Sequence, residues 1–160
     1  YLANHDSLTR TMNRHFFFQK GEYLLQYANR MEFSVIMLDI DHFKRLNDDF
    51  GHHVGDKVLQ HFAQIVRNNL RAQDLFARIG GEEFVILSPI DSQNLTINIA
   101  ERIRQALEVT PIGEIPAITV SIGIAHWPEI STDIHKVFKA ADEYLYLAKK
   151  DGRNCICYKK

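Results

Sequence analysis

The sequence lacks the features of a secreted or membrane-spanning protein. No stretch of its 160 residues approaches the ~20 apolar residues of a transmembrane helix, and no signal peptide opens the chain. Cysteine is scarce: Cys155 and Cys157 are the only two, and their spacing suits one face of a short strand better than a relaxed disulfide. We therefore expect a reduced, cytoplasmic domain that makes no contact with a membrane.

An excess of charge is also absent. Lysine and arginine number 19 and aspartate and glutamate number 20, which gives a net charge of −1. A surface that binds DNA or RNA needs a clustered basic field, so we expect no nucleic-acid partner. Internal repeats and low-complexity linkers are missing too. With 46% hydrophobic residues, the chain is long enough for one core and too short for two full domains.

Hydrophobic periodicity divides the chain into a compact alternation of helices and strands. Helices are expected at 7–29, 42–48, 57–70, 93–109 and 134–150, and strands at 33–39, 75–79, 84–87, 118–126 and 155–158. This order predicts an α+β fold, the ferredoxin-like sandwich of nucleotide-cyclase and polymerase palms. Its centre would be a mainly antiparallel five-stranded sheet with surrounding helices.

The most informative segment is Gly80-Gly81-Glu82-Glu83-Phe84, which joins two expected strands. Paired glycines in a hairpin let a phosphate approach the backbone closely. The two glutamates have no packing role at such a turn, and their hard oxygen atoms suit a divalent cation. The segment favours a metal and nucleotide site. The alternative is a solvated hairpin whose turn is acidic.

A second acidic element, Asp39-Ile40-Asp41, ends the apolar run 33–38. Carboxylates at the carboxyl end of a strand are typical ligand positions in α/β layers. We favour Asp39 as the group that faces the same ion as Glu82. The Ile40 carbonyl would be a further oxygen ligand, and Asp41 a supporting group or the ligand of a second ion. A cap for the following helix is the alternative, and it fits Asp41 better than Asp39.

Together these segments resemble the GGDEF-domain diguanylate cyclases, which join two GTP molecules into cyclic di-GMP. The resemblance covers nearly the whole chain in separated blocks that keep one order. The matching blocks are 6–9, 13–14, 39–44, 47–48, 50–52, 55–56, 78–84, 121–125, 141–142, 148–149 and 152–154. Arg10-Thr11 departs from the family's usual Gly-Leu, which affects a local turn and none of the expected catalytic residues.

The resemblance implies a magnesium-dependent nucleotidyltransferase, with Mn²⁺ as a substitute metal. By this resemblance Asp39, Glu82 and the Ile40 carbonyl bind the metal, and Glu83 lies beside them. Asp39, Glu82 and Glu83 are therefore the expected catalytic residues. Glu83 and Asp41 both stay open as the group that accepts the hydroxyl proton.

The same resemblance implies where GTP binds. The matching residues are Phe43 and Lys44 at a helix start, the turn glycines Gly80 and Gly81, the basic pair Lys149 and Arg153, and the guanine-reading pair Asn47 and Asp56. A carboxylate suits guanine because that base offers N1–H and N2–H donors that adenine does not present. The alternatives are ordinary ones: solvated charges for the three cations, and a helix cap for Asp56.

A regulatory site is also implied. Arg71-Ala72-Gln73-Asp74 precedes the glycine turn at the spacing of the family's RxxD inhibitory site for cyclic di-GMP, and Arg102 matches a secondary arginine. Arg71 would pair with a phosphate or the guanine Hoogsteen edge, and Asp74 would accept from the base. The alternative is an i, i+3 ion pair, which contributes roughly 0.2–0.5 kcal/mol.

The implied product needs two GTP molecules, and one domain carries one half-site. We therefore expect the active form to be a homodimer that its product inhibits. Residues 1–160 would form a single GGDEF catalytic domain, the C-terminal fragment of a longer sensor protein that a membrane segment elsewhere can anchor. A catalytically silent module that binds GTP or cyclic di-GMP is the rival class, although such modules usually have a broken hairpin motif. A cyclase or polymerase with another product is a second rival.

Overall fold

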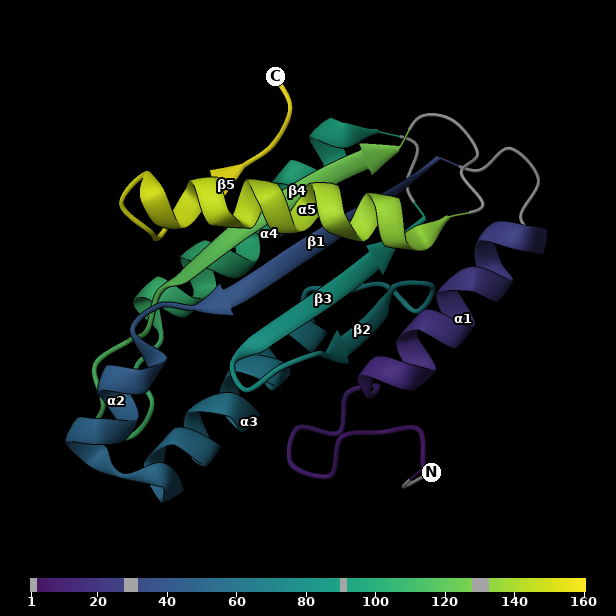
Figure 1. The fold of residues 1–160 in the computed structure, drawn as a ribbon. Helices are drawn as coiled ribbons and strands as arrows, with labels where there is room; N and C mark the ends of the chain where they lie inside the picture. Colours follow the sequence, from purple (N-terminus) through teal and green to yellow (C-terminus); the bar gives the residue numbers. More distant parts are fainter. Residues whose placement is uncertain (1–2, 28–31, 90–91, 128–132) are drawn as a thin grey trace.

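The structure is a computed structural model that describes residues 3–27, 32–89, 92–127 and 133–160. Its strands form one five-stranded sheet in the order β2-β3-β1-β4-β5 (Figure 1). They are β1 (Phe33–Ile40), β2 (Leu75–Arg78), β3 (Glu83–Ser88), β4 (Val120–Trp127) and β5 (Ile156–Cys157). Neighbouring strands are antiparallel except β4 and β5, which are parallel. The expected α+β fold with a mainly antiparallel sheet is confirmed.

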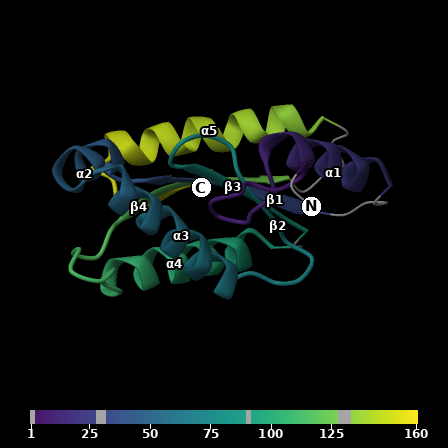
Figure 2. The ribbon, with the colours of Figure 1, turned by 90° about the horizontal axis from the view of Figure 1, so that it is seen from below.

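Helices cover both faces of this sheet (Figure 2). One layer holds α1 (Arg14–Tyr27) and α5 (Ile134–Lys150), and the other holds α3 (His52–Asn68) and α4 (Gln93–Val109). The short helix α2 (Phe43–Phe50) follows β1 directly. Within the described residues, no helix is both long enough and apolar enough to span a bilayer.

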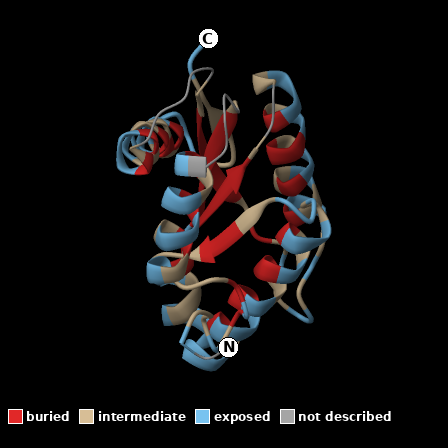
Figure 3. Ribbon diagram, turned by 90° about the vertical axis from the view of Figure 1, so that its right-hand side faces the viewer, coloured by how far each residue is buried: buried red, intermediate tan, exposed pale blue. Residues whose placement is uncertain are grey.

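The central strand β1 is buried along its whole length, which explains its unbroken apolar sequence. Side chains alternate between the two faces of a strand. Ile36 and Leu38 accordingly pack in the cluster with α3 and α4, whereas Val35 and Met37 pack in the cluster with α1 and α5. Figure 3 shows the buried sheet between helices whose outer sides are exposed. By this alternation, Asp39 faces the α5 layer.

Gly123 brings α5 unusually close to the sheet. A Cβ atom at this position of β4 would lie 2.2 Å from the Leu145 nitrogen and 2.3 Å from the Ala141 oxygen, both backbone atoms of α5. Only glycine fits there without moving the helix. The distance between α5 and the sheet therefore depends on Gly123 having no side chain.

The first expected helix begins later than the sequence predicts. Residues 7–9 form a turn, in which the Asp6 carboxylate accepts hydrogen bonds from the Thr9 nitrogen at 2.9 Å and the Thr9 hydroxyl at 2.7 Å. Such local bonds compete with helix formation. Arg10 adopts a left-handed conformation, with φ of 60°, and the helix starts at Arg14. The end expected at residue 29 lies outside the described residues.

The third helix begins earlier than the sequence predicts, at His52 instead of residue 57. Gly51 has a φ of 89° and lies between α2 and α3, so the chain turns within one residue. Asp56 therefore lies inside α3, and the alternative that it caps this helix is wrong. The other described boundaries agree with expectation to within about two residues.

Candidate functional site

The two acidic segments meet at one edge of the sheet. Asp39 lies opposite Glu83 in the antiparallel register of β1 and β3, and the Ile40 nitrogen donates to the Glu82 oxygen at 3.3 Å. Figure 1 shows the end of β1, the β2–β3 turn and the end of α5 on the same side of the molecule. Strand pairing thus places the sequence-predicted carboxylates together.

Lys149 joins this acidic group from the last turn of α5. Its ammonium donates to the Asp39 carboxylate at 2.7 Å, and the side chains are 33% and 6% exposed. Burial raises the pKa of Asp39 to about 6, although Lys149 opposes the shift, and the neighbouring Glu82 and Glu83 raise it further. A carboxylate held this far from its ordinary pKa among other acids is a common feature of functional sites.

Asp41 has a different environment from Asp39. Its carboxylate accepts hydrogen bonds from the Thr119 hydroxyl at 2.7 Å, the Ser121 hydroxyl at 2.6 Å and the Asn154 nitrogen at 3.0 Å. Three donors occupy most of its acceptor capacity. The group therefore fastens the loop after α5 to the sheet, and the alternative that it caps the following helix receives no support, since no side-chain cap is formed at α2.

Arg78 holds the glycine turn in place. Its guanidinium donates to the carbonyl of Gly80 at 3.1 Å and that of Gly81 at 2.8 Å, and it pairs with the Asp6 carboxylate at 3.3 Å. A Cβ atom at Gly81 would meet nothing within 4 Å, so this glycine leaves space beside the backbone. The sequence pattern alone does not indicate this role of Arg78 and Asp6, although both residues belong to the matching blocks.

The first two residues of α2, Phe43 and Lys44, differ in their exposure. The Phe43 side chain is buried in the core, so only the backbone of this residue is available at the helix N-terminus. The Lys44 side chain is exposed. His42 precedes the helix in a left-handed conformation, with φ of 56°, and makes no side-chain cap. The first N–H groups of a helix without a cap are free to bind an anion.

The expected base-reading residues lie together where α2 faces α3. The Asn47 Oδ1 atom is buried and has no hydrogen-bond partner among the described residues. It lies so close to Gly55 that a Cβ atom there would be 1.8 Å away, and the next residue, Asp56, is exposed. A buried acceptor without a partner is costly, so it marks a position where a ligand donor fits.

Arg153 is less closely placed than Lys149. It lies in the loop after α5 with a φ of 64°, its backbone nitrogen donates to the Ala148 oxygen at 3.0 Å, and its side chain is exposed. The structure thus brings Lys149 to the acidic group, whereas the Arg153 side chain extends into solvent.

The residues fit a divalent cation with hard ligands. Mg²⁺ is usually held by one or two protein carboxylates together with substrate phosphates and water. Asp39, with acidic neighbours and little exposure, supplies one such carboxylate, and Glu82 supplies another. Among the residues that the structure describes, these carboxylates do not form a three-ligand group with atoms within 4.8 Å. The arrangement agrees with a metal that substrate oxygens help to bind.

The RxxD residues line a separate cavity of about 360 Å³. Arg71 donates to Asp74 at 3.1 Å and to the Ser88 hydroxyl at 2.9 Å, and Ser88 donates to Asp74 at 2.8 Å. The side chains of Arg71 and Asp74 are 38% and 0% exposed, so the arginine covers the carboxylate. The ion pair named as the alternative is therefore formed here, at the wall of a cavity.

Two further arginines line this cavity, and the RxxD pattern does not include them. Arg10 and Arg67 line it beside Arg71, and Arg67 donates to the Thr9 oxygen at 2.9 Å. Arg67 stands four residues before Arg71, which is a spacing that could have indicated it. Arg102 lies on α4 and donates to the Asn69 oxygen at 3.2 Å, outside the residues that line the cavity.

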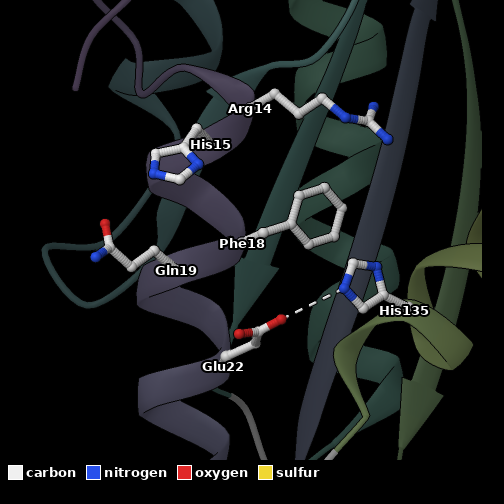
Figure 4. A pocket seen from close by; sticks show the side chains of 6 residues that line it. All are labelled: Arg14, His15, Phe18, Gln19, Glu22 and His135. Carbon is white, nitrogen blue, oxygen red and sulfur yellow. Dashed lines mark ion pairs between the residues drawn. The ribbon is translucent and has the colours of Figure 1, made fainter. Parts of the chain in front are cut away.

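A larger cavity, of about 570 Å³, lies between α1 and α5 and contains none of the predicted site residues. Figure 4 shows Phe18 against His135, with ring centroids 4.7 Å apart, and Glu22 paired with His135 at 3.4 Å. Arg14 extends over the Phe18 ring at 5.3 Å. The aromatic contacts join α1 to α5 on the outer side of their layer.

A family model described as diguanylate cyclase, GGDEF domain, matches residues 3–155. The chain belongs to the GGDEF-domain family. This GGDEF domain is 39% identical over 158 residues to diguanylate cyclase DgcM of Escherichia coli strain K12, covering 98% of the chain and 38% of the relative. It is also 39% identical over 165 residues to the uncharacterized protein YhcK of Bacillus subtilis strain 168, covering 99% and 46%. The chain thus spans less than half the length of these curated relatives.

A solved structure shows the same fold. The coiled coil and GGDEF domain of DgcB from Caulobacter crescentus, determined in complex with c-di-GMP, superimposes with a TM-score of 0.90 at 31% identity. The match covers 98% of this GGDEF domain and 86% of that chain. Family and fold therefore agree with the arrangement described above.

Proposed function

We propose that this domain is a diguanylate cyclase that condenses two GTP molecules into cyclic di-GMP and two pyrophosphates, as a homodimer with one GTP in each half-site. The proposal rests chiefly on one observation, the convergence of Asp39, Glu82 and Glu83 with the Lys149 ammonium at the sheet edge. Carboxylates for a metal and a cation for phosphates are the groups that phosphoryl transfer needs.

In each half of the reaction, the 3′-oxygen of one GTP attacks the α-phosphorus of the other. The new P–O bond replaces the bond to the β-phosphate oxygen, and pyrophosphate leaves. Asp39, Glu82 and the Ile40 carbonyl would hold Mg²⁺, which when bound lowers the pKa of an attacking hydroxyl and neutralises phosphate charge. Lys149 and Arg153 would hold the triphosphate, and Gly80 and Gly81 leave room for it.

The attacking hydroxyl must lose a proton, and Glu83 suits this task better than Asp41. Asp41 already accepts three hydrogen bonds that fasten the loop after α5. Glu83 is half-buried beside Asp39 and has no such set of donors among the described residues. The proton would pass to Glu83 directly or through one water molecule.

Selectivity for GTP would come from Asn47 and Asp56. The unpartnered Asn47 oxygen can accept from a guanine N–H group, and the exposed Asp56 carboxylate can accept from two neighbouring donors. Adenine lacks the N1–H and N2–H donors, so the buried Asn47 oxygen would stay unpaired, and an unpaired buried polar group rejects an analogue strongly. The backbone N–H groups of Phe43 and Lys44, at the α2 N-terminus, would donate to the phosphates.

Inhibition by cyclic di-GMP would use the cavity that Arg71 and Asp74 line. Because Arg71 now covers Asp74, the product would compete with this ion pair for both side chains. Arg10 and Arg67 add positive charge to the same cavity, which suits a ligand with two phosphates.

The decisive experiment incubates the protein at high concentration with Mg²⁺ and either GTP or ATP, with chromatographic separation of the products. Cyclic di-GMP is expected from GTP alone. Glu82→Gln should lower turnover by about 100-fold or more, whereas Glu143→Gln, an exposed α5 change, should not. GTP binding without turnover, even with two domains joined by a fused coiled coil, would instead establish the silent binding module.

A further inference from the structure

A second group of potential metal ligands lies at the end of the chain. The side chains of Asp151, Cys155 and Cys157 place one ligand atom each within 4.8 Å of the other two. In the part of the chain that the structure describes, no other three His, Cys, Asp or Glu residues converge this closely. Neither thiol is in a disulfide. This group plays no part in the proposed cyclase chemistry.

The backbone explains why these three side chains converge. Cys155 and Cys157 flank Ile156 at the edge strand β5, and positions two apart share one face of a strand. The loop before them reverses direction, because Gly152, Arg153 and Asn154 have positive φ values of 106°, 64° and 47°. This reversal returns Asp151, the C-cap residue that follows α5, to the cysteines.

Three hydrogen bonds keep the reversal in place. The Ala148 oxygen accepts from the Arg153 nitrogen at 3.0 Å and from the Cys155 thiol at 3.3 Å. The Asn154 nitrogen is bound to Asp41 at 3.0 Å. The bonds donated by the Arg153 and Asn154 nitrogens do not depend on the thiol proton and would remain when a metal binds, so the fold meets much of the cost of ordering the ligands.

The ligand types select the kind of metal. Two sulfur atoms and one carboxylate oxygen suit borderline or soft cations such as Zn²⁺, which binds thiolates at about 2.3 Å in tetrahedral sites. Mg²⁺ prefers oxygen ligands and does not favour thiolates. Both cysteines and Asp151 are partly or fully accessible, so a cation can reach them.

We propose that Asp151, Cys155 and Cys157 bind one thiophilic divalent cation of the Zn²⁺ class, with the fourth coordination position open to water or another ligand. The site is distinct from the proposed Mg²⁺ site in both position and ligand chemistry. It closes the loop that carries Arg153. Binding removes the thiol protons, so affinity rises with pH.

Co²⁺ titration of the reduced protein tests the site, because thiolate ligation gives a charge-transfer absorption that oxygen ligation lacks. We expect one Co²⁺ per chain, displaced by Zn²⁺ and not by excess Mg²⁺. The chain has only two cysteines, so Cys155→Ser combined with Cys157→Ser must abolish the absorption. Asp151→Asn should weaken binding about 10-fold or more, whereas Asp142→Asn, an exposed control on α5, should not.

A second measurement follows thermal unfolding with and without Zn²⁺. The midpoint should rise in the wild-type protein and stay constant in the double cysteine variant. No thiolate absorption, one cation per two chains, or full affinity in Asp151→Asn would overturn the proposal. None of these readouts uses GTP turnover, so their outcome is independent of the cyclase activity.

Discussion

The Lys149 ammonium group lies 2.7 Å from the Asp39 carboxylate, so the cation expected at the triphosphate neutralises the carboxylate expected at the metal. A bound metal ion and nucleotide would give each residue a new partner. The ion pair thus compensates both charges in the free domain, and in the proposed cyclase, substrate binding would exchange it for two new pairs.

Asp39 gives the free domain a specific pH dependence. Its folded pKa of about 6 exceeds the ordinary value of 3.8, so its contribution to stability is full below about pH 4 and is lost as the pH rises through 6. This loss does not occur in Asp39→Asn. The free energy of unfolding of the variant, relative to that of wild type, should therefore increase by about 2 kcal/mol from pH 4.5 to pH 7.5. Urea unfolding with a chelator measures it. If the free energies of unfolding of the variant and wild type differ by the same amount at pH 4.5 and pH 7.5, the raised pKa of Asp39 is contradicted.

Arg78 should matter more to stability than its partner Asp6. Arg78→Gln loses the ion pair and the bonds to the Gly80 and Gly81 carbonyls, which should cost about 1–3 kcal/mol. Asp6→Asn keeps an acceptor and leaves the carbonyl bonds intact, so its cost should be smaller. Urea unfolding of both variants gives the order. A larger loss for Asp6→Asn would show that the turn does not depend on Arg78.

Gly123→Ala should destabilise the domain by about 1–3 kcal/mol, because the new methyl group would collide with the α5 backbone near Ala141 and Leu145. Gly81→Ala is the matched control, since nothing lies within 4 Å of its added methyl group. That variant should stay within about 0.5 kcal/mol of wild type. Thermal unfolding of the two proteins checks the difference, and similar midpoints would refute the close packing.

Asn47→Ala should separate folding from nucleotide binding. Its Oδ1 atom has no partner among the described residues, so its removal should leave the free energy of unfolding unchanged or slightly raised. The KM for GTP should rise roughly 5-fold to 100-fold, and discrimination against ATP should fall. Asn98→Ala, on the exposed side of α4, is the control. A loss of stability with an unchanged KM would assign Asn47 a structural role.

Arg67→Ala should weaken cyclic di-GMP binding together with Arg71→Ala, by about 10-fold each, since both arginines line one cavity. Arg102→Ala should have a smaller effect, because Arg102 lies outside that lining. Calorimetric titration with cyclic di-GMP measures all three. The ranking fails if Arg102→Ala is the most damaging variant.

The sequence was sufficient for the fold and for the convergence of the acidic segments. Apolar periodicity gives the elements, and Asp39 and Glu83 meet because neighbouring strands pair in register. It was not sufficient for the two helix starts. Asp6 forms a local turn through Thr9, and Gly51 separates α2 from α3 within one residue, and neither effect changes the apolar pattern.

Contacts between distant residues were harder to predict still. The bonds of Arg78 to the turn and of Asp41 to Thr119 and Ser121 depend on how the loops approach the sheet. Periodicity carries no information on such approaches. The spacing of Cys155 and Cys157 predicts that they share one face of a short strand, but it carries no information on the loop reversal that brings Asp151 to them.

In the proposed nucleotide site, Lys149 comes from α5 on one face of the sheet, whereas Asp56 comes from α3, which covers the other face. The span between these two groups therefore depends on the spacing of the layers. On the α5 side, that spacing depends on Gly123, where the backbone of β4 meets the α5 backbone at Ala141 and Leu145. A side chain at Gly123 would push α5 away from the sheet, and with it Lys149 away from Asp39 and from the proposed base-reading residues.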